Sequence, residues 1–115
     1  MPSEGPGRAP DQALLDLLGL AARARAIVSG TDQVRGGIRK GEVVFAILAA
    51  DGSPTQLRKL TPLLDARRVP YRVLLDRERL GGAVGRGPLS AVGVTNRGFA
   101  TRAAELSDAL SSPRE

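Results

Sequence analysis

The stretch GEVVFAILAADGSP, residues 41–54, decides the fold class of this chain. Its centre, residues 43–49, is continuously apolar and partly β-branched, which is typical of a strand buried on both faces of a sheet. Ser53 and Pro54 then have the pattern of a helix start, with serine as the cap and proline in the first turn. A buried strand that leads into a helix favours an α/β fold.

Strands and helices are expected to alternate on either side of this stretch. Apolar residues at helical spacing predict helices over residues 11–24, from about 31 to Gly41, after Ser53, over 76–84 and from 96 to about 110. Extended segments are expected at 26–28, 72–75 and 89–94. This alternation predicts an α/β layered fold with helices on both faces of the sheet.

Polar residues at the expected helix starts predict the caps. The expected caps, besides Ser53, are Ser29 or Thr31, then Asp76 and Asn96. Pro62 lies inside the helix that follows Ser53, so we expect a kink there or a restart with Thr61 as a second cap.

The chain of 115 residues is expected to form one domain, residues 11–110, between flexible tails at 1–10 and 111–115. It has no cysteine and no histidine, which excludes disulfides, thiolate zinc sites and Ser–His or Cys–His catalysis. The acids Asp32, Asp51, Asp65 and Asp76 show no spacing that brings two of them together. We therefore expect no enzyme activity, no catalytic residue, no metal and no cofactor.

The charge balance favours a polyanionic partner. Seventeen Lys and Arg residues oppose 12 Asp and Glu residues, giving a net charge of +5, and nearly all the cations are arginine. The planar guanidinium suits phosphates and guanine edges. No apolar run reaches the length of a membrane span and no signal peptide is evident, so a cytoplasmic protein without a membrane partner is expected.

Three segments are candidate sites, and each has a plain structural alternative. The turn Gly30-Thr31-Asp32-Gln33 begins a helix, whose free N–H groups favour phosphate oxygens or base acceptors; the alternative is ordinary capping. The glycine-rich residues 80–88 lack the lysine–serine pair and the strand context of a nucleotide loop, yet a surface loop beside Arg86 can recognise a ligand. The last candidate is a basic edge formed by Arg23, Arg25, Arg35, Arg39 and Lys40, with scattered solvated arginines as the alternative.

Several short motifs occur in a familiar order between residue 12 and about 105. They are LLGLA (17–21), VSG (28–30), Val34, Ile38, Gly41, LAAD (48–51), VP (69–70), LGGAVG (80–85) and VGVTNRGFA (92–100). This order resembles the ribosomal L7Ae/L30e superfamily, most closely its small bacterial YlxQ-like branch. The resemblance implies a three-layer α-β-α sandwich with a mixed four-stranded sheet, and RNA binding, typically to kink-turns with tandem sheared G·A pairs.

The resemblance also implies where RNA binds. The family's contact surface corresponds here to Gly30, Thr31, Asp32, Gln33, Gly36, Arg86, Gly87, Pro88 and Leu89. From their charge, we expect Arg35, Arg39, Lys40 and Arg86 to contact phosphates beside this surface. Kink-turn-binding members usually carry Gly-x-Asn-Glu and a lysine three residues after the Glu. This chain has Asp32, Gln33 and Gly36 at those three positions.

The favoured function is therefore binding of structured RNA, of the kink-turn or ribosomal kind. The alternative is a protein-interaction module on the same fold, with ribosomal or translation proteins as partners and weakened RNA binding. A nucleotide site at residues 81–87 ranks last.

Overall fold

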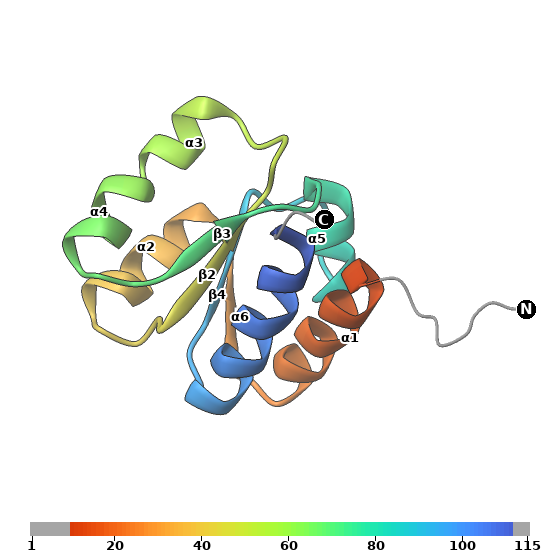
Figure 1. Cartoon of the computed structure of the whole chain (residues 1–115). Helices are drawn as coiled ribbons and strands as arrows, with labels where there is room; N and C mark the ends of the chain where they lie inside the picture. The colour runs from red at the N-terminus through yellow and green to blue at the C-terminus, as the bar shows by residue number, and fades with distance from the viewer. Residues whose placement is uncertain (1–9, 112–115) are drawn as a thin grey trace, which may run out of the picture.

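The computed structural model describes residues 10–111, in which helices and strands alternate (Figure 1). The elements are α1 (Pro10–Arg23), β1 (Ile27–Ser29), α2 (Thr31–Arg39), β2 (Phe45–Leu48), α3 (Pro54–Arg58), α4 (Thr61–Ala66), β3 (Tyr71–Val73), α5 (Arg77–Ala83), β4 (Ala91–Val94) and α6 (Arg97–Ser111). The expected tails, 1–10 and 111–115, lie outside the described residues, except that Pro10 begins α1 and Ser111 ends α6.

The four strands form one mixed sheet in the order β1-β4-β2-β3. β2 and β3 are parallel, whereas β4 runs antiparallel to both β1 and β2. The ends of β1, β2 and β3 therefore lie at the same edge of the sheet as the start of β4. We call this the carboxyl edge; it is marked by Ser29, Leu48, Val73 and Ala91.

Helices cover both faces of the sheet, which confirms the expected three-layer sandwich (Figure 1). Alternate side chains of β2 point to opposite layers, as a pleated strand requires. Phe45 and Ile47 are buried in a cluster with residues of α1, α5 and α6, whereas Ala46 and Leu48 are buried in a cluster with residues of α2 and α4. β2 is thus buried on both faces, as its apolar sequence predicts.

Two glycines, one in α2 and one in β4, leave room for the side chain of Val43 between the helix and the sheet. A Cβ atom added at Gly37 would stand 2.7 Å from the Val43 Cγ2 atom, and one added at Gly93 of β4 would stand 2.9 Å from the same atom. The side chain of Val43 therefore fills the space that side chains at both positions would need. Val43 itself is buried.

Three of the expected side-chain caps are confirmed, since each accepts a hydrogen bond from the backbone N–H three residues later. Ser53 Oγ accepts from Gln56 at 3.3 Å, Asp76 Oδ1 from Arg79 at 2.7 Å, and Asn96 Oδ1 from Phe99 at 3.0 Å.

The expected caps at Ser29 or Thr31 and at Thr61 are wrong. The residue before α2 is Gly30, with no side-chain cap, because Ser29 is held in β1 opposite Val92. A helix does restart at Thr61, with Pro62 in its first turn, but its N-cap is Leu60, whose side chain is fully buried in the core.

Strands β2, β3 and β4 are shorter than expected, whereas β1 keeps the expected length and lies one residue later than 26–28. β3 covers Tyr71–Val73 and not 72–75, because Leu75 adopts a φ of 66°, which ends the extended backbone. β2 and β4 likewise lack the first residues of the apolar runs 43–49 and 89–94.

Candidate functional site

The turn before α2 and the segment before β4 meet at the carboxyl edge. The Gly30 N–H donates a hydrogen bond to the Ala91 carbonyl oxygen at 2.9 Å. The Leu89 Cδ2 atom lies 4.0 Å from the position that a Cβ of Gly30 would occupy. The structure therefore brings the first two candidate segments together, which their separation of about sixty residues in the sequence does not reveal.

A shallow groove of about 470 Å³ opens between these segments and α3. Its lining is Gly30, Thr31, Asp32, Gln33, Gln56, Lys59, Pro88, Leu89 and Ser90. We call it the Gly30 groove. The side chains of Asp32, Gln33 and Lys59 are exposed, so they are available to a ligand in this groove.

The start of α2 offers unused hydrogen-bond donors to the Gly30 groove. No side chain caps this helix, and its first N–H groups, from Thr31 to Gln33, have no partner within the helix. These groups and the helix dipole favour a phosphate oxygen or a base acceptor. Asp32 in the same turn places a negative charge beside them, whereas the Gln33 amide can both donate and accept.

Gly30 has a backbone conformation that permits this arrangement. Its φ of 93° and ψ of 153° lie in a region that is essentially restricted to glycine. The chain turns from β1 into α2 at this residue.

Arg35 and Arg39 line a second groove, of about 380 Å³, which lies between α2 and the α3–α4 pair. They lie one turn apart on α2, and they line this groove with Arg58, Lys59, Pro62, Leu63 and Ala66. We call it the α2–α4 groove. Lys59 lines both this groove and the Gly30 groove.

The expected single basic edge is not formed. Arg23 lines a cavity in the opposite helix layer, between α1 and α5, far in the fold from Arg35 and Arg39. Lys40 is exposed at the end of α2 and lines neither groove.

Arg86 and Gly87 are exposed on the loop that leads to Pro88 and Leu89, but they do not line the Gly30 groove. This loop folds back on α5. The Arg86 backbone N–H donates a hydrogen bond to the Gly81 carbonyl oxygen at 2.8 Å, and the Leu89 backbone N–H donates one to the Arg77 carbonyl oxygen at 3.0 Å. A Cβ atom at Gly81 would overlap the Gly87 peptide group. Close packing, and not a nucleotide, accounts for Gly81.

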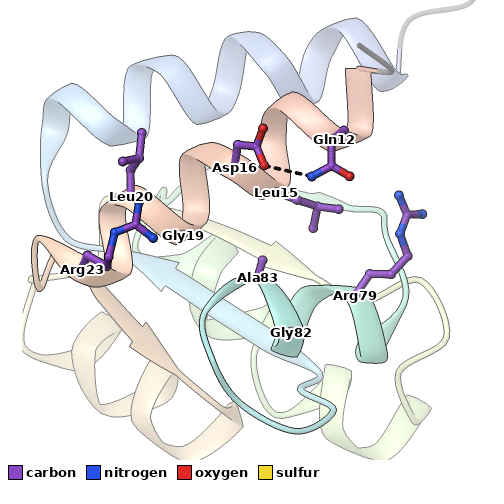
Figure 2. Close-up of a pocket in the computed structure, with 9 residues that line it drawn as sticks. All are labelled: Gln12, Leu15, Asp16, Gly19, Leu20, Arg23, Arg79, Gly82 and Ala83. Carbon is purple, nitrogen blue, oxygen red and sulfur yellow. Dashed lines mark hydrogen bonds between the residues drawn. The ribbon is translucent and has the colours of Figure 1, made fainter. Parts of the chain in front are cut away.

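The cavity between α1 and α5 has about 640 Å³ and mixed charge (Figure 2). Figure 2 shows Arg23 and Arg79 at opposite ends of it, with Leu15 between them and Asp16 hydrogen-bonded to Gln12. Arg79 forms an ion pair with Asp11 and donates a hydrogen bond to its carboxylate. This hydrogen bond lowers the pKa of the Asp11 carboxyl and raises the pKa of Arg79. An acid within the cavity and a paired arginine at its end make it a poor site for a polyanion.

Two of the acidic residues considered for catalysis have structural contacts. Asp51 Oδ1 accepts a hydrogen bond from the Arg77 N–H at 2.8 Å, and Asp76 caps α5. Within residues 10–111, acidic side chains form no group of three that could hold a metal ion.

Sequence reasoning missed the contribution of α3 to both grooves. Gln56, Arg58 and Lys59 line them, but the helical pattern there indicates only its buried stripe. The usable signal was topological: α3 follows β2, which ends at the same sheet edge as β1.

Fold and site together define a small α-β-α sandwich protein with two adjoining grooves, at and beside one end of the sheet, that share Lys59. The chain belongs to the ribosomal protein L7Ae/L30e/S12e/Gadd45 family, whose model matches residues 12–104. This confirms the family expected from the order of motifs. Among the helices of residues 10–111, none has the length and apolar character that crossing a membrane requires.

Named relatives and solved structures agree with this assignment. The chain is 38% identical over 92 residues to RNA-binding protein YlxQ of Bacillus subtilis strain 168, an alignment that covers 80% of this chain and 92% of the relative. A protein with unknown function from Bacillus halodurans C is 36% identical, with a TM-score of 0.79 over 83% of this chain and 96% of that one. The Giardia lamblia 15.5kD RNA binding protein shares the fold at a TM-score of 0.74 and 21% identity, over 90% and 92% of the two chains.

Proposed function

We propose that this chain is an RNA-binding protein that recognises structured RNA, of the kink-turn or ribosomal kind, in the cytoplasm through the Gly30 groove. The observation that carries the proposal is the uncapped start of α2, which opens into a groove beside Leu89 and Lys59. The family and the printed name of the Bacillus subtilis relative support RNA as the ligand.

Each part of the Gly30 groove has a role in this proposal. The N–H groups at the start of α2 and the Gln33 amide face base edges or phosphate oxygens, and Lys59 supplies a cation. Pro88 and Leu89 offer an apolar surface to a base that is not stacked in a helix. Arg86, exposed on the adjoining loop, adds a phosphate contact at the rim.

The proposal is tested with labelled RNAs in a fluorescence anisotropy titration at low salt. The probes are a kink-turn stem, ribosomal RNA fragments and a fully paired duplex, with the wild type and the variants Gln33→Ala and Gly30→Val. We expect the wild type to prefer a structured RNA over the duplex, and both variants to weaken that binding. Val at position 30 strains the backbone by about 1–3 kcal/mol and so displaces the start of α2.

Gly82→Val is the matched control. Gly82 lies in α5 with open space around its Cβ position, in the opposite helix layer. RNA binding by this variant should equal that of the wild type. The proposal fails if no structured RNA binds the wild type, and the surface is wrong if folded Gly30→Val binds RNA unchanged.

A protein-interaction module on the same fold is the second candidate function, with ribosomal or translation proteins as partners. It is favoured by Leu20, a large apolar side chain that is 50% exposed at the α1–α5 cavity (Figure 2). A pull-down after nuclease treatment, repeated with Leu20→Ser, tests it. Recovery of a ribosomal or translation protein that the variant loses would support this function, whereas recovery that depends on intact RNA would exclude it.

A further inference from the structure

The α2–α4 groove is lined by cations, and no acidic residue among residues 10–111 lines it. Arg35 and Arg39 face it from α2, and Arg58 and Lys59 face it from α3 and its C-cap, above a floor of Pro62, Leu63 and Ala66. Over the part of the chain that the structure describes, none of these four cations forms an ion pair or a side-chain hydrogen bond. Four uncompensated cations around one groove produce a local positive potential.

A fifth cation, Arg67, offsets the partial negative charge at the C-terminal end of α2. The carbonyl oxygens at a helix C-terminus lack intrahelical partners and carry partial negative charge. Arg67 donates from Nη1 to the carbonyl oxygens of Ile38, at 3.3 Å, and Arg39, at 3.1 Å. The groove is therefore positive at its far end as well, where bare carbonyls would repel an anion.

Lys59 makes the two grooves continuous. It lines the Gly30 groove with Gln33 and the α2–α4 groove with Arg35. An RNA strand that lies at the start of α2 can thus pass over Lys59 and run along this helix. The helix has nine residues and is about 13 Å long.

We propose that the α2–α4 groove is a second RNA site, which binds the phosphate backbone of the strand that leaves the Gly30 groove. This inference rests on the proposed RNA binding and adds a surface to it. Arg35 and Arg39 lie on a different flank of α2 from Gln33, Gly36 and Lys40, which are spaced to share the other flank. The two flanks of α2 then contact different parts of the RNA.

An acidic peptide is the other polyanion that such a groove suits. RNA is favoured because the groove continues into the uncapped start of α2, and because three of its four cations are arginines, whose fork matches a phosphate group.

The test compares the salt dependence of RNA binding between two double variants of the full chain. Arg39→Gln/Arg58→Gln removes two cations that line only the α2–α4 groove. Arg97→Gln/Arg102→Gln removes the same charge from α6, in the opposite layer. The probe is the labelled kink-turn stem, extended at both ends by single-stranded uridines, and thermal unfolding verifies that both variants fold.

We expect the groove variant to reduce the magnitude of the log–log salt slope by about 1.4–1.8, the value for two lost phosphate contacts. At 0.1 M salt this corresponds to binding weaker by about 25- to 60-fold. The α6 variant should keep the slope of the wild type.

A crosslink gives a second readout that does not depend on charge. The chain has no cysteine, so Ala66→Cys carries a single benzophenone at the groove floor, and exposed Ala109→Cys on α6 is the matched control. Irradiation should crosslink the RNA to position 66 and not to position 109.

The outcomes separate this inference from the proposed function. If the wild type binds the probe and Gly30→Val does not, while the groove variant keeps its salt slope and position 66 does not crosslink, the second site is overturned alone. If the wild type binds no RNA, both proposals are overturned. If the groove variant loses binding of a labelled poly-glutamate peptide but keeps that of RNA, the groove is a peptide site and the inference is wrong.

Discussion

Replacing Gly36 with lysine should strengthen both RNA binding and the fold. Gly36 lies inside α2, and no atom beyond the helix's own backbone lies within 4 Å of its Cβ position, so a long side chain fits there. Its spacing from Gln33 and Lys40 places it on the flank of α2 that begins at the Gly30 groove. The variant restores the lysine that kink-turn-binding relatives usually carry at this position.

The two effects have different magnitudes and different origins. Glycine in a helix interior is less favourable than a straight-chain residue by about 0.5–1 kcal/mol, so the free energy of unfolding should rise by about that amount. Such a gain raises the Tm by about 2–6 °C. One added phosphate contact should increase the magnitude of the log–log salt slope by about 0.9, which is about an eightfold gain in affinity at 0.1 M salt.

Gly36→Ala separates the charge from the helix. It should give at least the same rise in Tm in a thermal melt, with no change in the salt slope of RNA binding measured by anisotropy. If Gly36→Lys and Gly36→Ala bind the kink-turn stem equally well, residue 36 does not face RNA. The assignment of the Gly30 groove and the adjoining flank of α2 would then be refuted.

Three other changes test neighbouring parts of the structure. Asp32→Asn removes a negative charge beside the free N–H groups of α2, so RNA affinity should rise in an anisotropy titration while stability falls by about 0.3–1 kcal/mol, from the lost interaction with the helix dipole. Gly81→Ala forces its methyl group against the facing loop and should lower the free energy of unfolding by about 1–3 kcal/mol in a denaturant titration; Gly82→Ala, in open space, should not. Because pairing with Arg79 lowers the pKa of Asp11, this carboxylate stabilises the fold above its unfolded-state pKa of about 3.9 and ceases to do so as the pH falls through its folded pKa. The Tm difference between the wild type and Asp11→Asn should therefore be present at neutral pH and disappear in acid; an equal difference at both would contradict it.

Local chemistry made much of the fold predictable. Ser53, Asp76 and Asn96 could be identified as caps because the bond each one makes reaches only three residues along the chain. The cap of α2 could not be identified in this way. Gly30 is the cap because Ser29 is paired in the sheet with Val92, a residue more than sixty positions away.

The candidate site was predictable in part. The family resemblance implied that the start of α2 lies beside the loop before β4, and the contact between Gly30 and Leu89 agrees with that expectation. Lys59 was missed because a helical pattern indicates the buried stripe and not what the exposed residues face. Lys40 was expected to share one basic edge with Arg39, but neighbouring helical residues point about 100° apart, and Lys40 does not line the α2–α4 groove.

The close contact of α2 with the sheet also bears on the thermodynamics of binding. With Val43 filling the space between Gly37 and Gly93, α2 cannot move toward the sheet. The hydrogen bond from Gly30 to Ala91 fixes its first turn in the same way. A ligand at this helix therefore meets a preorganised surface and loses little affinity to ordering the protein. The entropic cost of mutual fit then falls on the ligand, so an RNA that is already bent should bind more tightly than one that must bend on contact.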